Sequence, residues 1–345
     1  MKSPDTPIDL AAMKTFATEA GIPASILPPD FKSALIRADE FATMEIPPRA
    51  SLLGNWMKEG DLGYLFAPRG VGKTWMALLL GRAIATGDGV GEWHSMGSCP
   101  VFYLDAEMNL ADVQQRMKAL SITTPDFHLL SSDKLFSQGE EGVNIAHRDH
   151  QDALSDMLPD GSVFIIDNLS TAQVGMEENS NDAFDALRVW LQRLRARNIT
   201  VIVVHHAGRN GNMRGASRRE DMAHWIIRLK GQSDEGRKET TLISSFEKAR
   251  NCAAFEVRPL RWRIHEENGE IVVECQIHSG MEAVVEAVAS GLEGATEIAE
   301  ELGISKSQVS KLAAKAIKAG LLTKARNKYV VVQSEAFPEL PEGVL

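Results

Sequence analysis

The sequence has little cysteine. Three cysteines, Cys99, Cys252 and Cys275, are spread over 345 residues, and no two of them form a C-x-x-C pair. This spacing indicates neither a disulfide framework nor a zinc cluster. Long apolar runs are also lacking: none approaches the roughly 18–20 residues that a membrane helix needs, and MKSPDTPIDL at the start lacks the apolar core of a secretory signal. We therefore expect a cytoplasmic protein without membrane contact.

Positive charge is in deficit, with 37 Lys+Arg against 47 Asp+Glu and a formal net charge of −10. With 44% hydrophobic and 24% charged residues, the composition is that of a globular protein, which excludes general disorder. The acidic total is an average over unlike parts, because Lys and Arg collect in 209–219 and 306–328. These two basic segments are the places where we expect nucleic acid to bind.

The pattern of residue types divides the chain into four parts. Residues 1–50 are polar and rich in proline, which is typical of an arm or linker. Residues 51–278 form the main domain, 279–333 a smaller domain, and 334–345 a loose tail. In the main domain, apolar β-branched runs at 63–67, 101–105, 163–167 and 200–204 alternate with helical patterns at 73–86, 109–119, 147–157 and 181–197. Such alternation predicts an α/β fold with a mainly parallel central sheet. Segments 225–229, 240–246, 261–265 and 271–275 are expected to extend the sheet as antiparallel strands.

A phosphate-binding loop is the strongest motif. APRGVGKT (67–74) lies between a predicted strand and a predicted helix, and it follows the template G-x-x-x-x-G-K-[ST] except that Ala67 replaces the first glycine. Backbone amides of such a loop surround phosphates, the lysine reaches the β- and γ-phosphates, and the hydroxyl binds Mg²⁺. The alternative is a chance glycine-rich turn. The predicted nucleotide-binding residues are Pro68, Arg69, Gly70, Val71, Gly72, Lys73, Thr74 and Trp75.

Two further strands end in carboxylates. VFIIDN (163–168) fits a Walker B strand whose Asp167 holds Mg²⁺ together with Thr74. VFYLDAEMN (101–109) places Glu107 at the same edge of the sheet, where it can deprotonate the attacking water. Each residue has a structural alternative: Asp167 could cap a helix or sit in a loop, and Glu107 could be an edge carboxylate with no role.

The strand TVIVVHH (200–206) brings two histidines to this edge. A polar side chain there can hydrogen-bond the γ-phosphate, and we favour His206 over His205 for this role. Structural hydrogen bonding is the alternative for either residue. Zinc binding is not indicated, because no further ligands have matching spacing.

These motifs, taken in order, resemble a RecA-type ATPase, and more closely the RepA-like hexameric replicative helicases of plasmids and phages. The segments GMEENSNDA (175–183) and HHAGRNGNMRGAS (205–217) are similar to that group, and the resemblance covers roughly residues 46–275. It implies a ring of six subunits with ATP at the subunit interfaces and loops facing a central channel. Arg209 and Arg214 would then contact single-stranded DNA, unless 207–217 is an ordinary solvated loop.

The segment EKARN (247–251) resembles the K-x-R element of ring helicases. The resemblance implies that Lys248 and Arg250 reach the γ-phosphate of the neighbouring subunit, with Arg250 as the arginine finger. Arg228 and Arg214 compete for the finger role, and a surface salt bridge is the alternative for each.

The C-terminal part has the spacing of a helix-turn-helix followed by a β-hairpin, and it looks like a winged-helix domain. From 306 to 328 it contains seven Lys or Arg and no Asp or Glu, which favours contact with duplex DNA. Protein contact or ring assembly is the alternative. The predicted DNA-binding residues here are Lys306, Ser307, Gln308, Lys311, Lys315 and Arg326.

Together these features predict an ATP- and Mg²⁺-dependent DNA helicase or translocase, a homo-oligomer with replication or phage and plasmid partners. A regulatory or loader ATPase that binds DNA without unwinding it is the alternative. A filament-forming recombinase is less favoured, because no N-terminal polymerisation motif is evident.

Overall fold

The computed structural model describes residues 13, 15, 16, 19, 31–173, 181–208, 213, 220–232, 239–253, 256–267, 270–302, 304–326 and 328–332, without the side chains of 181–186 and 232. The chain divides into two units, Met1–Pro48 and Arg49–Leu345. In the first unit, residues 31–48 are all exposed and contain a 3-10 turn, η2 (Lys32–Ala34), and a single helical turn, α2 (Ala38–Phe41). The predicted domain boundaries stay a prediction.

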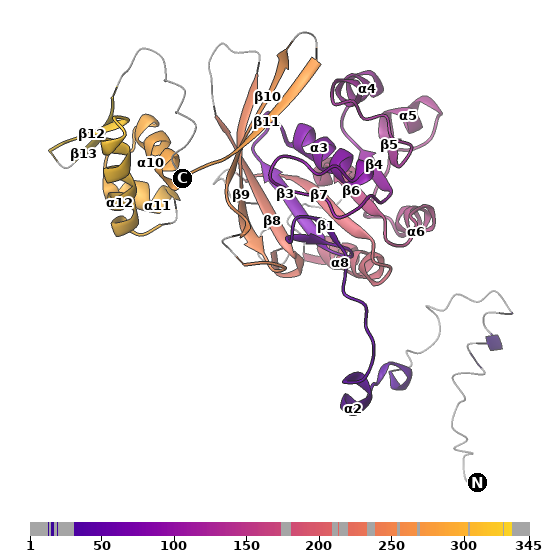
Figure 1. Ribbon diagram of the computed structural model, residues 1–345. Helices are drawn as coiled ribbons and strands as arrows, with labels where there is room; N and C mark the ends of the chain where they lie inside the picture. Colours follow the sequence, from indigo (N-terminus) through magenta and orange to yellow (C-terminus); the bar gives the residue numbers. More distant parts are fainter. Residues whose placement is uncertain are drawn as a thin grey trace. The chain divides into compact units, whose positions relative to one another are not determined.

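The second unit is built on a nine-stranded sheet (Figure 1). Its strand order is β11-β10-β9-β8-β3-β7-β6-β4-β5. The pairs from β8 to β5 are parallel, and those from β8 to β11 are antiparallel. The predicted α/β fold with a mainly parallel sheet is therefore confirmed. The strands are β3 (Leu62–Ala67), β4 (Val101–Asp105), β5 (Phe127–Ser131), β6 (Val163–Asp167), β7 (Thr200–His206), β8 (Trp225–Gln232), β9 (Thr240–Ala249), β10 (Leu260–Glu267) and β11 (Glu270–Ile277).

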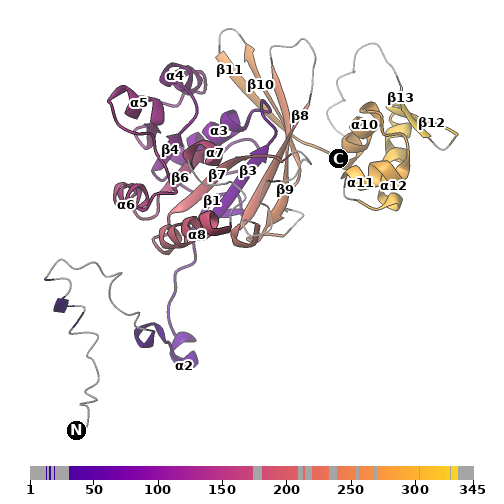
Figure 2. The same ribbon diagram turned by 180° about the vertical axis from the view of Figure 1, so that it is seen from behind.

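Helices cover both faces of the parallel part of the sheet (Figure 2). The strands alternate between two hydrophobic cores: on β6, Val163 and Ile165 pack with one core, and Phe164 and Ile166 with the other. The helices are α3 (Lys73–Thr86), α4 (Leu110–Ala119), α5 (Ser132–Ser137), α6 (Arg148–Met157), α7 (Leu169–Ala172) and α8 (Asn181–Ala196). In the part of the chain described, no helix combines the length and apolar character needed to cross a bilayer.

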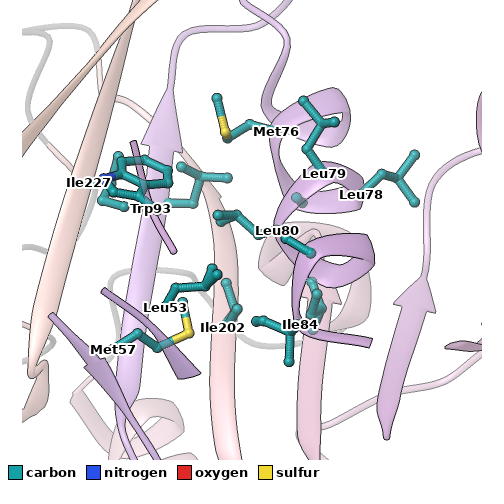
Figure 3. Close-up of a cluster of buried hydrophobic side chains, with 14 of the residues drawn as sticks. Leu53, Met57, Met76, Leu78, Leu79, Leu80, Ile84, Trp93, Ile202 and Ile227 are labelled. Carbon is teal, nitrogen blue, oxygen red and sulfur yellow. The ribbon is translucent and has the colours of Figure 1, made fainter. Parts of the chain in front are cut away.

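The core on the α3 face fixes the helix that follows the phosphate loop. Met76, Leu80 and Ile84 of α3 pack over Ile202 and Ile227 of the sheet (Figure 3). A small hairpin, β1 (Ser51–Leu53) and β2 (Met57–Lys58), contributes to the same core. An aromatic group of Trp56, Trp93, Trp225, Trp262 and Phe246 extends this core, with ring centroids 4.9–6.0 Å apart. Each such pair contributes about 0.5–1.5 kcal/mol beyond the area it buries.

The C-terminal elements are three helices and a hairpin. They are α10 (Gly280–Ala289), α11 (Ala295–Leu302), α12 (Lys306–Lys318), β12 (Leu322–Ala325) and β13 (Lys328–Val331). Val284, Ile298, Val309 and Tyr329 are buried in one shared core. Capping boxes at Ser279–Glu282 and Ser305–Gln308 begin α10 and α12. That this part is a winged-helix domain, with the DNA binding this implies, stays a prediction. The tail expected at 334–345 lies outside the described residues.

Candidate active site

The loop between β3 and α3 has the backbone that a phosphate site requires. Gly70 and Gly72 have φ angles of 79° and 103°, which glycine adopts without steric cost. A Cβ atom on Gly72 would lie 3.1 Å from side-chain carbons of Leu242 and Thr240. Helix α3 begins directly after Gly72, so its unpaired first-turn amides adjoin the loop. Gly72 is thus required both by its conformation and by its surroundings.

Ala67, which replaces the template glycine, is the buried last residue of β3. It is not among the described non-glycine residues with positive φ. The substitution is therefore compatible with the loop, because alanine adopts the β conformation readily.

Lys73 is buried, and its Nζ donates to the carbonyl oxygens of Ala67 at 3.2 Å and Pro68 at 2.9 Å. Burial lowers the pKa of this ammonium group, while the nearby carboxylates of Asp167 and Glu107 act in the opposite direction. A buried cation held mainly by carbonyl oxygens fits an anionic ligand such as a phosphate, which would supply the missing negative charge.

Asp105 and Asp167 end the neighbouring strands β4 and β6 and are paired in register. Tyr103 donates its hydroxyl to Asp167 Oδ2 at 2.6 Å, and Thr74 also hydrogen-bonds this carboxylate. Burial raises the pKa of Asp167, and these two hydrogen bonds oppose the rise. The two predicted Mg²⁺ ligands, Thr74 and Asp167, are therefore in contact.

Asp105 has no role in the sequence prediction, yet its side chain is buried beside them. Its Oδ1 accepts the backbone N–H groups of Met108 at 3.2 Å and Glu107 at 3.4 Å, while its Oδ2 has no hydrogen-bond partner among the described residues. Burial raises the pKa of Asp105 to about 6. A carboxylate oxygen without a described partner, on the residue paired in register with Asp167, fits Mg²⁺, which prefers oxygen ligands. No group of three or more His, Cys, Asp or Glu side chains in the described residues is arranged to hold a metal, so phosphate and water would supply the other ligands.

Glu107 is exposed at the same edge of the sheet. Its Oε2 accepts a hydrogen bond from Nδ2 of the buried Asn168, which follows Asp167 directly. Sequence reasoning assigned no role to Asn168 or Tyr103. The sequence does contain a signal for Tyr103. It lies two residues before Asp105 on β4, and side chains two residues apart point to the same side of a strand.

His205 and His206 are buried at the end of β7. In register they lie opposite Phe66 and Ala67, the last residues of β3 before the phosphate loop. The structure thus brings both histidines to the base of that loop.

Lys248 and Arg250 lie at the other end of the sheet. Strand β9 runs antiparallel to β8, so Lys248 is level with Ile226 and Tyr64. Arg250 lies further toward the start of β3, since its backbone N–H bonds to His224, which bonds to Leu62, whereas Lys73 follows the end of β3. Lys248 Nζ donates to the carbonyl of Glu220, and Arg250 Nη2 donates to that of Asp221 at 2.8 Å. Within one copy, these two cations therefore do not lie beside Lys73. Their competitor Arg228 is level with Phe66 and lies 3.9 Å from Glu247.

The comparison with protein families matches residues 28–212 to the AAA domain. The chain belongs to the AAA domain family. The match includes the phosphate loop, Glu107, Asp167 and both histidines, and it ends before Lys248. The family is one of P-loop ATPases with a RecA-like fold, which is consistent with ATP hydrolysis at this site.

Two solved structures are similar to this AAA domain protein at low identity. One is flagellar accessory protein FlaH from Methanocaldococcus jannaschii, with 14% identity, a TM-score of 0.45, and coverage of 63% of this chain and 90% of that chain. The other is KaiC-like protein PH0186 from Pyrococcus horikoshii OT3, with 16% identity, a TM-score of 0.42 and the same coverage. Neither likeness assigns an activity to this chain, and the resemblance to RepA-like helicases stays a prediction.

The predicted DNA-binding residues of the AAA domain protein fall in two places. Arg209 and Arg214 lie outside the described residues. On α12, Gln308 is exposed, and its Oε1 accepts from the backbone N–H of Ser305 at 2.9 Å, so part of its side chain caps the helix. Arg326 is exposed in the hairpin turn with a φ of 47°. The other predicted residues of α12 are also exposed: Lys306, Ser307, Lys311 and Lys315.

Proposed function

We propose that this protein is a Mg²⁺-dependent ATPase that moves along or unwinds DNA, and that a second copy completes each catalytic site. One observation carries the ATPase proposal: ionisable side chains at the carboxyl ends of β4, β6 and β7 lie beside the phosphate loop and Lys73, the first residue of α3. They are Asp105, Glu107, Asp167 and His206. Such a group has the parts that phosphoryl transfer to water requires.

Each side chain has a definite task in this proposal. Lys73 and the loop amides bind the β- and γ-phosphates, and Glu107 accepts a proton from the attacking water. His206, at the end of β7, senses the γ-phosphate. Thr74 and Asp167 hold Mg²⁺, which when bound supplies positive charge against the phosphates.

The need for a second copy is supported by the position of Lys248 and Arg250. Both cations lie at the end of the sheet away from Lys73, and backbone carbonyls hold them there. A neighbouring copy with its phosphate loop at this end would receive them, as the K-x-R resemblance implies.

Turnover measurements test the ATPase proposal. Lys73→Ala should abolish hydrolysis and weaken ATP binding. Glu107→Gln should lower kcat by at least about 100-fold with ATP binding retained, because an amide cannot accept the proton. Glu140→Gln, at an exposed glutamate after α5, is the matched control and should turn over normally. Undiminished turnover in Glu107→Gln would contradict the assignment of the base.

The DNA part of the proposal is supported by the exposed lysines of α12, and a forked duplex tests it. ATP-dependent strand displacement is expected of the full-length protein. ATPase activity that duplex DNA stimulates without strand displacement would favour the regulatory or loader ATPase instead. Electron micrographs with ATP and single-stranded DNA would distinguish closed rings from filaments.

A further inference from the structure

Asn168 joins the end of the Walker B strand to the candidate base. It is 1% exposed and directly follows Asp167, and its Nδ2 donates to Oε2 of Glu107. We propose that Asn168 is a positioning residue that holds the Glu107 carboxylate in the orientation required for catalysis. This inference rests on the proposed ATPase function.

The orientation of the Asn168 side chain is set by helix α7. Its Oδ1 accepts from the backbone N–H of Thr171 at 3.1 Å and from the Thr171 hydroxyl, also at 3.1 Å. A backbone N–H can only donate, so the atom that faces it must be the amide oxygen. The amide nitrogen therefore points away from α7, toward Glu107. The N-cap of α7 and the bond to Glu107 are made by opposite ends of one rigid amide.

Glu107 needs such a partner, because the chain around it provides little restraint. It lies two residues beyond the end of β4, is exposed, and has a side chain with three rotatable bonds. Its backbone N–H is bonded to Asp105 at 3.4 Å, which fixes the main chain but leaves the carboxylate free to rotate. A hydrogen bond from a buried amide fixes one carboxylate oxygen and leaves the other to accept a proton. Holding a base in place lowers the entropy that the reaction must lose.

The test is Asn168→Ser. Serine is a good N-cap and keeps an acceptor for α7, but its side chain is too short to reach Glu107. We expect kcat to fall roughly 10–100-fold, the range for loss of a partner that orients a reacting group. KM and ATP affinity should change less than about threefold, because Asn168 makes no bond to the phosphate loop in the described contacts.

Asn109→Ser is the matched control. Asn109 is the N-cap of α4, its Oδ1 accepts from the backbone N–H of Asp112 at 3.1 Å, and its side chain makes no described hydrogen bond to Glu107. Normal kcat in this variant, with reduced kcat in Asn168→Ser, would separate loss of the Glu107 contact from loss of an asparagine cap. Equal losses in both variants would overturn the proposal. If Asn168→Ser does not fold, Thr171→Val keeps the backbone donor and removes the hydroxyl, and kcat should fall about two- to fivefold.

A double-mutant cycle distinguishes this inference from the proposed function. In the Glu107→Gln background, Asn168→Ser should lower the single-turnover rate no further, because the group it positions is absent. Normal hydrolysis by Glu107→Gln alone would refute the assigned base. Loss of hydrolysis in Glu107→Gln together with normal turnover in Asn168→Ser would refute only the role of Asn168.

Discussion

At the scale of single residues, the site contains a buried carboxylate, Asp105, whose ionised form is unfavourable in the folded protein. Asp105 is buried beside Asp167, and within the described part of the chain one of its carboxylate oxygens has no hydrogen-bond partner. Burial raises its pKa to about 6, so ionisation of Asp105 at neutral pH lowers the stability of the ligand-free protein. A bound cation would remove this cost, so nucleotide with Mg²⁺ is expected to stabilise the fold.

The sign of this effect predicts a pH dependence. An acid with a raised pKa binds more protons in the folded than in the unfolded state between pH 3.8 and about 6, so stability falls as the pH rises through that range. Asp105→Asn should therefore increase the free energy of unfolding at pH 7.5 by about 1–3 kcal/mol without ligand, and by little near pH 4. Urea denaturation at both pH values measures this. Asp88→Asn, at an exposed residue, should show no such difference.

At the scale of elements, β3 is fixed in place by close contact with β8. Gly63 lies beside Trp225, whose ring would be 2.0 Å from any Cβ atom at that position. Trp225 is fully buried and packs against Trp56 with ring centroids 4.9 Å apart, so it has no room to move. The phosphate loop depends on this packing, because it begins where β3 ends.

Gly63→Ala should therefore destabilise the protein by about 1–3 kcal/mol or more, the cost of overpacking a filled core. Thermal unfolding should show a lower Tm. Gly231→Ala, in β8, is the control, because its Cβ atom would meet Val71 at an ordinary 3.5 Å. An unchanged Tm in Gly63→Ala would mean that β3 and β8 separate more easily than their packing indicates.

Much of this arrangement could be predicted from the sequence. Continuous apolar runs such as 163–167 are buried on both faces, and they identify parallel strands directly. Strand β5 was missed because FHLLS lies at the sheet edge, is only partly buried, and has no β-branched residue. The side-chain contacts of Tyr103 and Asn168 could not be predicted, because they depend on distances between strands that pattern alone does not give.

At the scale of the whole molecule, charge is distributed unevenly along the chain. The net charge of −10 coexists with α12, on which Lys306, Lys311 and Lys315 are exposed. Binding to DNA phosphates releases counterions, so it should weaken as salt rises.

Lys311→Ala with Lys315→Ala should weaken DNA binding uniformly across sequences and reduce the slope of log K against log salt by about 2. Fluorescence anisotropy at several salt concentrations measures this slope. Lys118→Ala, on α4, should leave it unchanged. An unaltered slope in the double variant would mean that α12 does not contact DNA.

The separation of Lys73 and Arg250 at opposite ends of the sheet predicts that two different inactive variants can complement each other. If each site takes its cation from another copy, a Lys73→Ala chain still supplies an intact Arg250 to its neighbour. An Arg250→Ala chain still has an intact phosphate loop. Equal mixtures of these two inactive variants should regain ATPase activity at about one site in four. A chain carrying both changes should rescue neither variant. Recovery of activity from two inactive chains would make catalysis a property of the pair of copies rather than of either one.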